Sequence, residues 1–182
     1  MTSLPLEQRR VILVAFDNSG NAKDAFNWAE QYILRPGKDH VVLISVVQDD
    51  GAGFLDSFLL KSVSLGEIDD ALGYGDGDTY PEQEQKEFLK TAEERAEKLL
   101  HDLSRPIAKQ DISVQRIVVR NADPRTVICQ AAINNRAELI VIGSRGLSTI
   151  KRALIGSVSD YVVKNAECPV LVVKSKDAQH AS

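Results

Sequence analysis

Short apolar runs recur along the chain, and longer segments with a helical rhythm separate them. A run that is apolar throughout and too short for a helix predicts a strand covered on both faces, as in a parallel sheet. Four runs are of this kind, the second with a single serine: Val11–Phe16, Val41–Val47, Leu139–Ile142 and Pro169–Val173. A fifth predicted strand, Ser113–Val119, has Val114 and Val118 among its apolar positions.

Between these runs, apolar residues recur every three or four positions, which indicates amphipathic helices. The first predicted helix follows the turn residues Asp17-Asn18-Ser19-Gly20 and ends at Pro36-Gly37. Another opens at Asp123-Pro124, where the aspartate is a capping residue and the proline fits the first turn. The last predicted helix opens at Gly156-Ser157.

The longest predicted helix begins after Pro81. Its residues repeat at steps of four, four, three and four positions, as one stripe of a long amphipathic helix. The apolar stripe consists of Phe88, Ala92, Ala96, Leu99 and Leu103. The charged residues around it predict a solvated outer face.

Strands that alternate with helices predict an α/β fold. Right-handed crossovers between parallel strands place helices on both faces of one sheet, so we expect a single doubly wound domain over residues 1–182. Ligands of such folds bind beyond the carboxyl ends of the strands, where the strand order reverses.

The segment 48–80 departs from this pattern because it is rich in glycine and acidic residues. We interpret it as a long insertion that contains at most one short helix. We consider two hypotheses for this segment. It is a solvated linker, or it covers the ligand or contacts a partner. The last residues, 175–182, form a polar tail.

Composition narrows the function further. A content of 43% hydrophobic residues is ample for one core, and a net charge of −4 argues against general nucleic-acid binding. No apolar run approaches the roughly 18 residues of a membrane span, and the first residues lack a signal-peptide pattern. Cys129 and Cys168 lack metal-binding spacing, so we expect reduced, buried thiols. These features predict a cytoplasmic protein, with the nucleus as the alternative, and no membrane partner.

Several well-known catalytic motifs are missing from the sequence. It contains no P-loop, no G-x-G-x-x-G after the first strand and no G-x-S-x-G elbow. His40, His101 and His180 are scattered and form no metal pair or evident Ser-His-Asp set. We therefore predict no catalytic residues and no protein metal site.

A glycine-bearing loop follows the fourth predicted strand. It reads Gly143-Ser144-Arg145-Gly146, then nine residues, then Gly156-Ser157. Glycines let the main chain approach a ligand, and a helix that opens after Gly156 offers free N–H groups to a phosphate. The residues alone leave two alternatives: a phosphate-binding loop, or a structural loop in which Ser157 only caps the helix.

This loop in this setting resembles the universal stress protein family. The likeness extends to Val11-Ile12-Leu13-Val14-Ala15-Phe16-Asp17-Asn18-Ser19 at one end and to Cys168-Pro169-Val170-Leu171-Val172-Val173 at the other. It covers about residues 9–174 apart from 48–80. The resemblance implies strand order 3-2-1-4-5, pairing into homodimers through Pro169–Val173 and binding of an adenine nucleotide.

The resemblance also implies a set of nucleotide-binding residues. Asp17, with Ala15 and Phe16 beside it, is expected near the ribose, and the backbone of Val46 near adenine. Ile142 and Gly143 are expected on the ribose side. The phosphates are expected among Gly146, Gly156, Ser157, Val158 and Ser159, and Arg145 occupies a variable position beside them.

The resulting hypothesis is a stress-response or signalling module that depends on ATP, AMP or ADP, alone or with Mg²⁺. One alternative is a slow ATPase or phosphotransferase, for which no convincing base is evident. Another is a dimeric interaction protein in which the nucleotide is structural. The open, apolar fifth strand favours dimerisation under each hypothesis.

Overall fold

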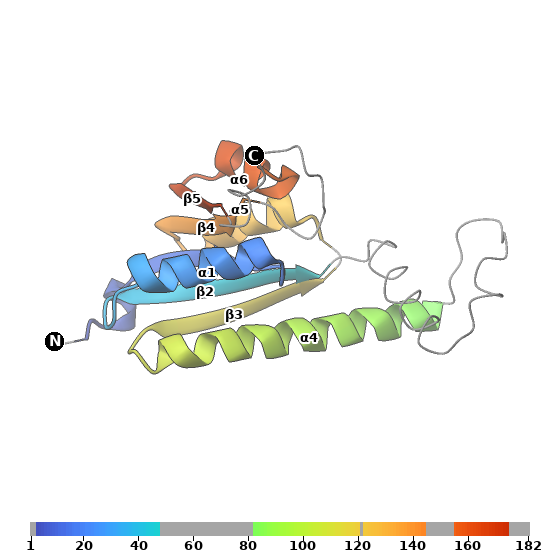
Figure 1. Cartoon of the computed structure of the whole chain (residues 1–182), viewed down its shortest axis with the longest axis horizontal. Coiled ribbons are helices and arrows are strands. Elements are labelled where there is room, and N and C mark those ends of the chain that lie inside the picture. The colour runs from blue at the N-terminus through green and yellow to red at the C-terminus, as the bar shows by residue number, and fades with distance from the viewer. Residues whose placement is uncertain (1–2, 48–81, 121, 145–154, 175–182) are drawn as a thin grey trace, which may run out of the picture.

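The computed structural model describes residues 3–47, 82–120, 122–144 and 155–174 (Figure 1). The predicted insertion 48–80, the tail 175–182, and Arg145 and Gly146 therefore lie outside the described residues. The described part forms a five-stranded sheet in the order β3-β2-β1-β4-β5, with every pair of neighbours parallel. This order and the α/β class confirm the fold expected from the sequence.

The elements closely follow the predicted ones. The strands are β1 (Arg10–Ala15), β2 (Asp39–Val47), β3 (Ser113–Arg120), β4 (Leu139–Gly143) and β5 (Val170–Val173). The helices are the short 3₁₀ helix η1 (Leu6–Gln8), α1 (Gly20–Tyr32), α4 (Glu82–Ala108), α5 (Pro124–Asn134) and α6 (Ser157–Asn165).

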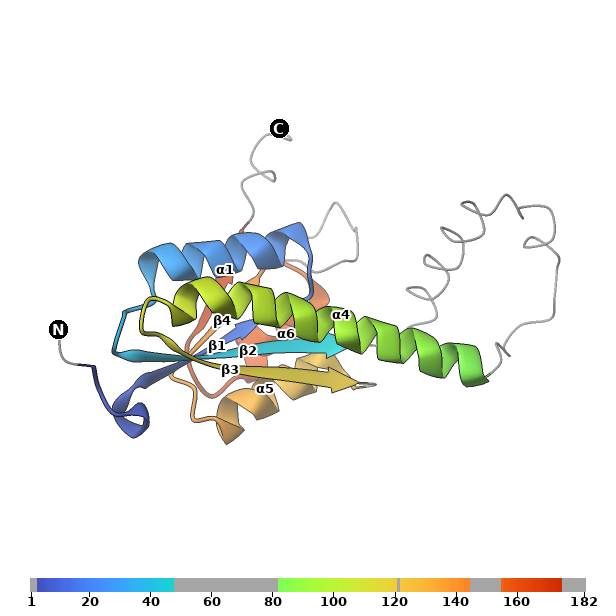
Figure 2. The same cartoon turned by 90° about the horizontal axis from the view of Figure 1, so that it is seen from below.

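The sheet has helices on both faces. Helices α1 and α4 cover one face, and α5 and α6 cover the other (Figures 1 and 2). In the central strand β1, Ile12 and Val14 belong to the core under α1 and α4, whereas Leu13 and Ala15 belong to the core under α5 and α6. Successive side chains of a strand point to opposite faces, so a strand covered on both sides must be apolar throughout.

The buried stripe of α4 differs from the predicted one. Leu89, Ala96, Leu100 and Ile107 are buried, whereas the predicted Leu99 and Leu103 are only half-buried at its margin. A buried serine, Ser104, lies within the stripe. Its hydroxyl donates to the carbonyl of His101 and accepts from Arg116 of β3. Because Ser104 is polar, the hydrophobic pattern alone does not locate the centre of the buried stripe.

An ion pair with a buried carboxylate joins the amino ends of β1 and β2. The Arg10 guanidinium of β1 contacts both carboxylate oxygens of Asp39 in β2, at 3.1 and 2.8 Å. Asp39 is 1% exposed, and it also accepts the N–H of Arg35 at 2.7 Å. Arg10 donates in addition to the carbonyl of Ile33 at the end of α1. The pair thus joins β1, β2 and the segment after α1.

Within the described residues, no helix combines the length and the apolar character needed to cross a membrane.

We predict that Asp39→Ala lowers the free energy of unfolding by about 3 kcal/mol. Removal of one partner of a buried pair leaves the other charge uncompensated, and the value is at the low end because Arg10 keeps contact with water. Urea denaturation measures the change. The exposed pair Asp160–Lys164 provides the control, since Asp160→Ala should cost less than about 1 kcal/mol. Equal effects of the two substitutions would contradict the assignment.

Candidate functional site

The strand order reverses between β1 and β4. These strands are neighbours, but β1 leads through α1 to β2 on one side, whereas β4 leads through α6 to β5 on the other. Helices α1 and α6 therefore start at the same edge of the sheet and on opposite faces (Figure 1). The carboxyl ends of strands at such a reversal form the crevice in which doubly wound folds bind ligands.

The turn from β1 into α1 is held by its own side chains. An Asp17 carboxylate oxygen accepts the N–H of Ser19 at 3.1 Å, and the Ser19 hydroxyl accepts the N–H of Ala22 at 3.1 Å as the N-cap of α1. Between them Asn18 has a φ of 63°, a left-handed conformation that asparagine tolerates. The turn therefore presents the half-buried Asp17 at a defined position beside the end of β1.

Gly143, the last residue of β4, permits close contact with the start of α1. A Cβ at this position would lie 2.8 Å from the carbonyl carbon and oxygen of Asn21 and 3.0 Å from the nitrogen of Ala22. The φ of Gly143 is not in the left-handed region. This glycine is thus explained by the approach of the two backbones and not by a turn conformation.

Ser144 closes the base of the glycine loop. Its N–H donates to the carbonyl of Val173 in β5. Its carbonyl accepts the N–H of Gly156 at 2.6 Å and faces the Ser159 hydroxyl at 3.1 Å. The start of α6 is therefore attached directly to the end of β4. The buried Ser159 hydroxyl is engaged in this contact or in one to the carbonyl of Gly156.

The N-terminus of α6 has no side-chain cap. Gly156 is its N-cap residue, so Ser157 does not cap the helix, while the choice between a structural and a phosphate-binding loop stays a prediction. Ser157 is instead the exposed first residue of the helix, followed by the half-buried Val158. Uncapped N–H groups and the positive end of the helix dipole suit an anion.

The predicted site residues fall into distinct groups. Ala15, Phe16 and Ile142 are buried, and the Phe16 ring packs edge-on against Phe26 at 6.5 Å, so only their backbones are candidates for ligand contact. Val46 lies half-buried near the end of β2. Their nucleotide contacts, and those of Arg145 and Gly146 outside the described residues, stay predictions.

Sequence reasoning missed two structural residues of this edge. Asn21 provides the backbone against which Gly143 packs, and its side-chain oxygen lies 3.5 Å from the Ser144 hydroxyl. In the sequence, Ser144 is a variable position of the glycine motif and carries no signal of its own. Neither pattern nor spacing signals such contacts, because Ser144 lies 123 positions from Asn21.

No metal centre is evident in the part of the chain that the structure describes, since no three His, Cys, Asp or Glu side chains gather there. Cys129 and Cys168 are half-buried free thiols. Burial raises the pKa of both, which keeps them protonated near neutral pH.

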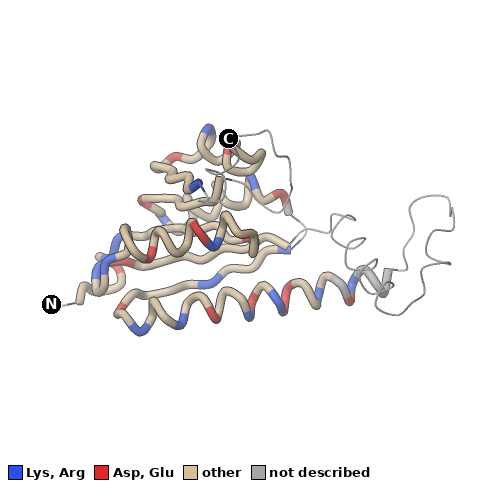
Figure 3. The backbone as a smooth tube through the Cα atoms, viewed as in Figure 1, with Lys and Arg blue, Asp and Glu red and all other residues tan. Residues whose placement is uncertain are grey.

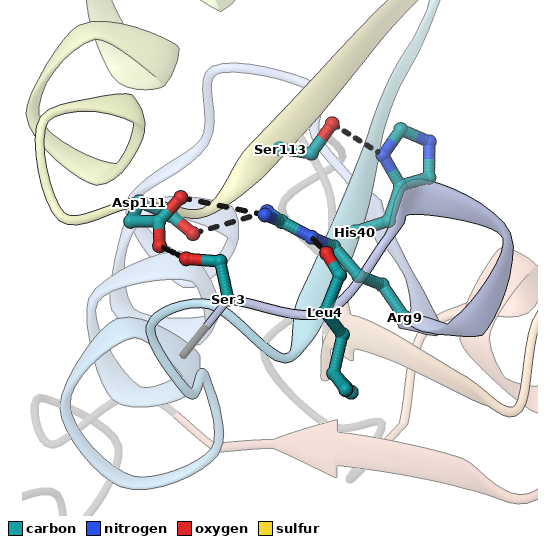
Figure 4. Close-up of polar contacts among 6 residues, drawn as sticks. All are labelled: Ser3, Leu4, Arg9, His40, Asp111 and Ser113. Atoms are coloured by element: carbon teal, nitrogen blue, oxygen red, sulfur yellow. Dashed lines mark hydrogen bonds and ion pairs between the residues drawn. The ribbon is translucent and has the colours of Figure 1, made fainter. Parts of the chain in front are cut away.

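A polar cluster lies at the opposite, amino edge of the sheet (Figure 4). Asp111 accepts hydrogen bonds from the Ser3 hydroxyl and the Arg9 guanidinium, and Nδ1 of His40 lies 3.0 Å from the Ser113 hydroxyl. The carboxylate of Asp111 is thus engaged with Ser3 and Arg9, while His40 pairs with Ser113. The contacts join the segment before β1 to the start of β3, which is a structural role.

Comparisons with known proteins agree with this architecture. A model of the universal stress protein family matches residues 60–174. Among curated proteins, the chain is 28% identical to universal stress protein PHOS32 of Arabidopsis thaliana, over 93% of this chain and 66% of that protein. It is 43% identical to a universal stress protein A-like protein of the same plant, over 31% of this chain and 32% of the relative. The chain thus spans less than two thirds of the length of these relatives.

Solved structures share the fold. Hypothetical protein MJ0577 superposes with a TM-score of 0.67 at 22% identity, over 93% of this chain and 98% of that one. A universal stress protein family protein from Arabidopsis thaliana with AMP bound gives 0.58 at 19% identity, over 95% and 97%. A universal stress protein in complex with cAMP gives 0.51 at 17% identity, over 90% and 95%.

We predict that Gly143→Ala lowers the free energy of unfolding by about 1–3 kcal/mol, because the added methyl forces α1 away from β4. Gly20→Ala, at the start of the same helix, is the matched control. A Cβ there would meet nothing within 4 Å, so this substitution should be neutral or slightly stabilising. Thermal or urea unfolding distinguishes them, and equal destabilisation by both would disprove the packing role of Gly143.

The amino-edge cluster predicts a pH dependence of stability. Burial, with a smaller contribution from the Arg9 charge, lowers the pKa of His40 from 6.5, although a hydrogen bond with Gln115 opposes the shift. The unfolded chain therefore binds the proton first, and stability falls as the pH decreases below about 6.5. A second loss follows at lower pH, because bonds from Ser3 and Arg9 hold the pKa of Asp111 below 3.8. Urea midpoints between pH 7.5 and 5 should fall less steeply in His40→Gln than in the natural chain.

Proposed function

The chain belongs to the universal stress protein family, and we propose that it binds an adenine nucleotide at the β1–β4 crevice as a nucleotide-dependent stress-response or signalling module. The observation that carries the proposal is the uncapped N-terminus of α6, which Ser144 attaches to the end of β4 beside the Asp17 turn. A helix N-terminus that can donate hydrogen bonds to a phosphate, and a carboxylate that can accept them from sugar hydroxyls, thus lie at one edge of the sheet.

The phosphates would bind at the start of α6. Main-chain N–H groups of Ser157 and Val158 lie in its first turn, and the exposed Ser157 hydroxyl adds a donor. Ser159 would act indirectly, since its hydroxyl is engaged at the loop base and positions the helix. Gly146 and Arg145 complete the proposed loop from the sequence alone.

The nucleoside would lie across the ends of β1 and β2. The Asp17 carboxylate can accept hydrogen bonds from ribose hydroxyls, and its position is held by the N–H of Ser19. The main chain near Val46, at the end of the neighbouring strand, can bond the adenine edge. Ala15, Phe16, Ile142 and Gly143 would contribute their main chain and the apolar floor.

Two relatives support the class of nucleotide that we propose. One universal stress protein has AMP bound and another is in complex with cAMP, so an adenine nucleotide is the ligand class we extend to this chain. We propose ATP, ADP or AMP, with Mg²⁺ entering on the phosphates and not on a protein site. Signalling requires that two of these nucleotides bind the states of the protein with different affinity, since equal affinity shifts no population.

We also propose that the protein is a homodimer paired through β5. This strand is an edge of the described sheet, and each of its four residues is half-buried. An apolar edge strand with open backbone groups favours pairing with another chain.

The nucleotide proposal predicts that Asp17→Asn weakens binding of ATP, ADP and AMP by about tenfold or more, since it removes a charged acceptor worth about 1.5–3 kcal/mol. The asparagine keeps an oxygen for the N–H of Ser19, so the turn should survive. Isothermal titration calorimetry measures the affinities, and native mass spectrometry identifies the nucleotide retained on purification.

Asp102→Asn is the matched control because this aspartate is exposed on α4. The double variant Gly146→Ala/Gly156→Ala should lose the retained nucleotide. A natural chain that binds none of the three nucleotides would refute the proposal, and equal affinity in Asp17→Asn would refute the role of Asp17.

A further inference from the structure

We propose that Trp28 and Tyr32 of α1 and Val163 of α6 anchor the contact between two copies of this chain, on either side of β5. The inference rests on the proposed pairing through β5 and goes beyond it, because it assigns the binding energy to side chains of the flanking helices. We call these three residues together with β5 the edge surface.

The aromatic pair lies on the side of α1 that faces away from α4. Glu30 points toward α4, since its carboxylate accepts a hydrogen bond from Gln110 just beyond that helix. Trp28 is two positions away, and residues two apart differ by about 200° around a helix. Because α4 packs on β2 and β3 while α1 packs on β4 and β5, the far side of α1 faces the β5 edge.

Both rings are accessible there. Trp28 is 37% exposed and Tyr32 is 62% exposed, and their ring centroids lie 5.2 Å apart. Two adjacent aromatic rings on an outer helix surface are the type of group that anchors protein interfaces.

The same geometry applies on the other face of the sheet. The Arg125 guanidinium of α5 lies over the ring of Tyr161 in α6, which identifies the side of α6 that faces α5. Val163 is two positions further and therefore lies on the opposite side, next to the β5 edge. It is 48% exposed. Apolar side chains thus flank β5 on both faces.

The other edge of the sheet has a different chemistry. The side of β3 toward α4 carries Arg116, and Arg120 at its end pairs with Glu93 at 3.2 Å. A groove of about 580 Å³ between β3 and α4 is lined almost entirely by charged or titratable side chains, which are Glu94, Glu97, Lys98, His101 and Arg116, with Val118. Lys, Arg, Asp and Glu recur along the part of α4 that is coloured in Figure 3. Such residues discourage strand pairing, so β5 is the edge suited to association.

The size of the surface indicates why flanking residues are needed. A stable interface buries about 800 Å² on each partner, which exceeds what a pair of four-residue strands can supply. A second copy of this chain is the fitting occupant because a two-fold axis through the β5 pair brings the same flanks together from both molecules. Each β5 then obtains a backbone partner while the apolar flanks are removed from water.

Tryptophan fluorescence reports on this contact directly, since Trp28 is the single tryptophan of the chain. We expect sedimentation velocity to show dimers at micromolar concentration. On dilution to monomer, the Trp28 emission should shift to longer wavelength and acrylamide quenching should increase, in step with the loss of dimer. A dimer whose dissociation leaves emission and quenching unchanged would overturn the assignment of Trp28 while the pairing itself stands.

Variants test the remaining anchors. Trp28→Ser and Val163→Ser should each weaken dimerisation tenfold or more, and circular dichroism should show an unchanged fold. Ile133→Ser is the control because Ile133 is 45% exposed on α5. Val172→Lys should abolish pairing through the strand.

The outcomes separate the proposals. Loss of dimer in Val172→Lys alone, with normal dimers in both serine variants, would overturn this inference and keep the pairing through β5. A natural chain that stays monomeric at all concentrations would overturn both. Nucleotide affinity, measured separately, decides the proposed ligand.

Discussion

The three inner strands of this sheet, β2, β1 and β4, bury side chains on both of their faces, and the architecture follows from that requirement. Parallel strands need crossover connections, and the crossovers here are helices that cover the two faces in turn. The alternation within β1 shows the result, with Val14 under α1 and α4 and Leu13 under α5 and α6. Right-handed crossovers cover both faces only if strands are added on both sides of β1. The strand order therefore reverses between β1 and β4, and this reversal creates the crevice.

Close backbone contacts at that crevice determine which residues are possible there. The first turn of α1 rests directly on Gly143, and the carbonyl of Ser144 receives the first residues of α6. These backbone contacts hold the N-termini of α1 and α6 at one edge of the sheet. The glycine motif therefore has a structural component and a proposed binding component, and Gly143 has a part in both because it packs against α1 and would contribute its main chain to the proposed site.

The same packing leaves the outer edges of the two edge strands, β3 and β5, uncovered. Helices cover faces and leave edges open, so the side chains around each edge decide what happens there. Around β3 these are charged groups such as Arg116 and Glu97, and around β5 they are Trp28, Tyr32 and Val163. A strand edge bordered by apolar groups gains by association, whereas a charged one loses the hydration of its charges.

The sequence by itself determined the fold class, the position of each strand and the starts of the helices, because two-sided burial makes the inner strands apolar runs and helix starts have short-range signals such as Asp123-Pro124. The family resemblance added the strand order. Only the tertiary structure decided which face of α4 is buried, that Ser159 serves the loop base, and that the Trp28 and Tyr32 rings lie together on the exposed surface of α1. Periodicity records whether a residue is buried in its own element. It does not record which residue from a distant part of the chain it meets, because those partners are brought together only when the crossovers close.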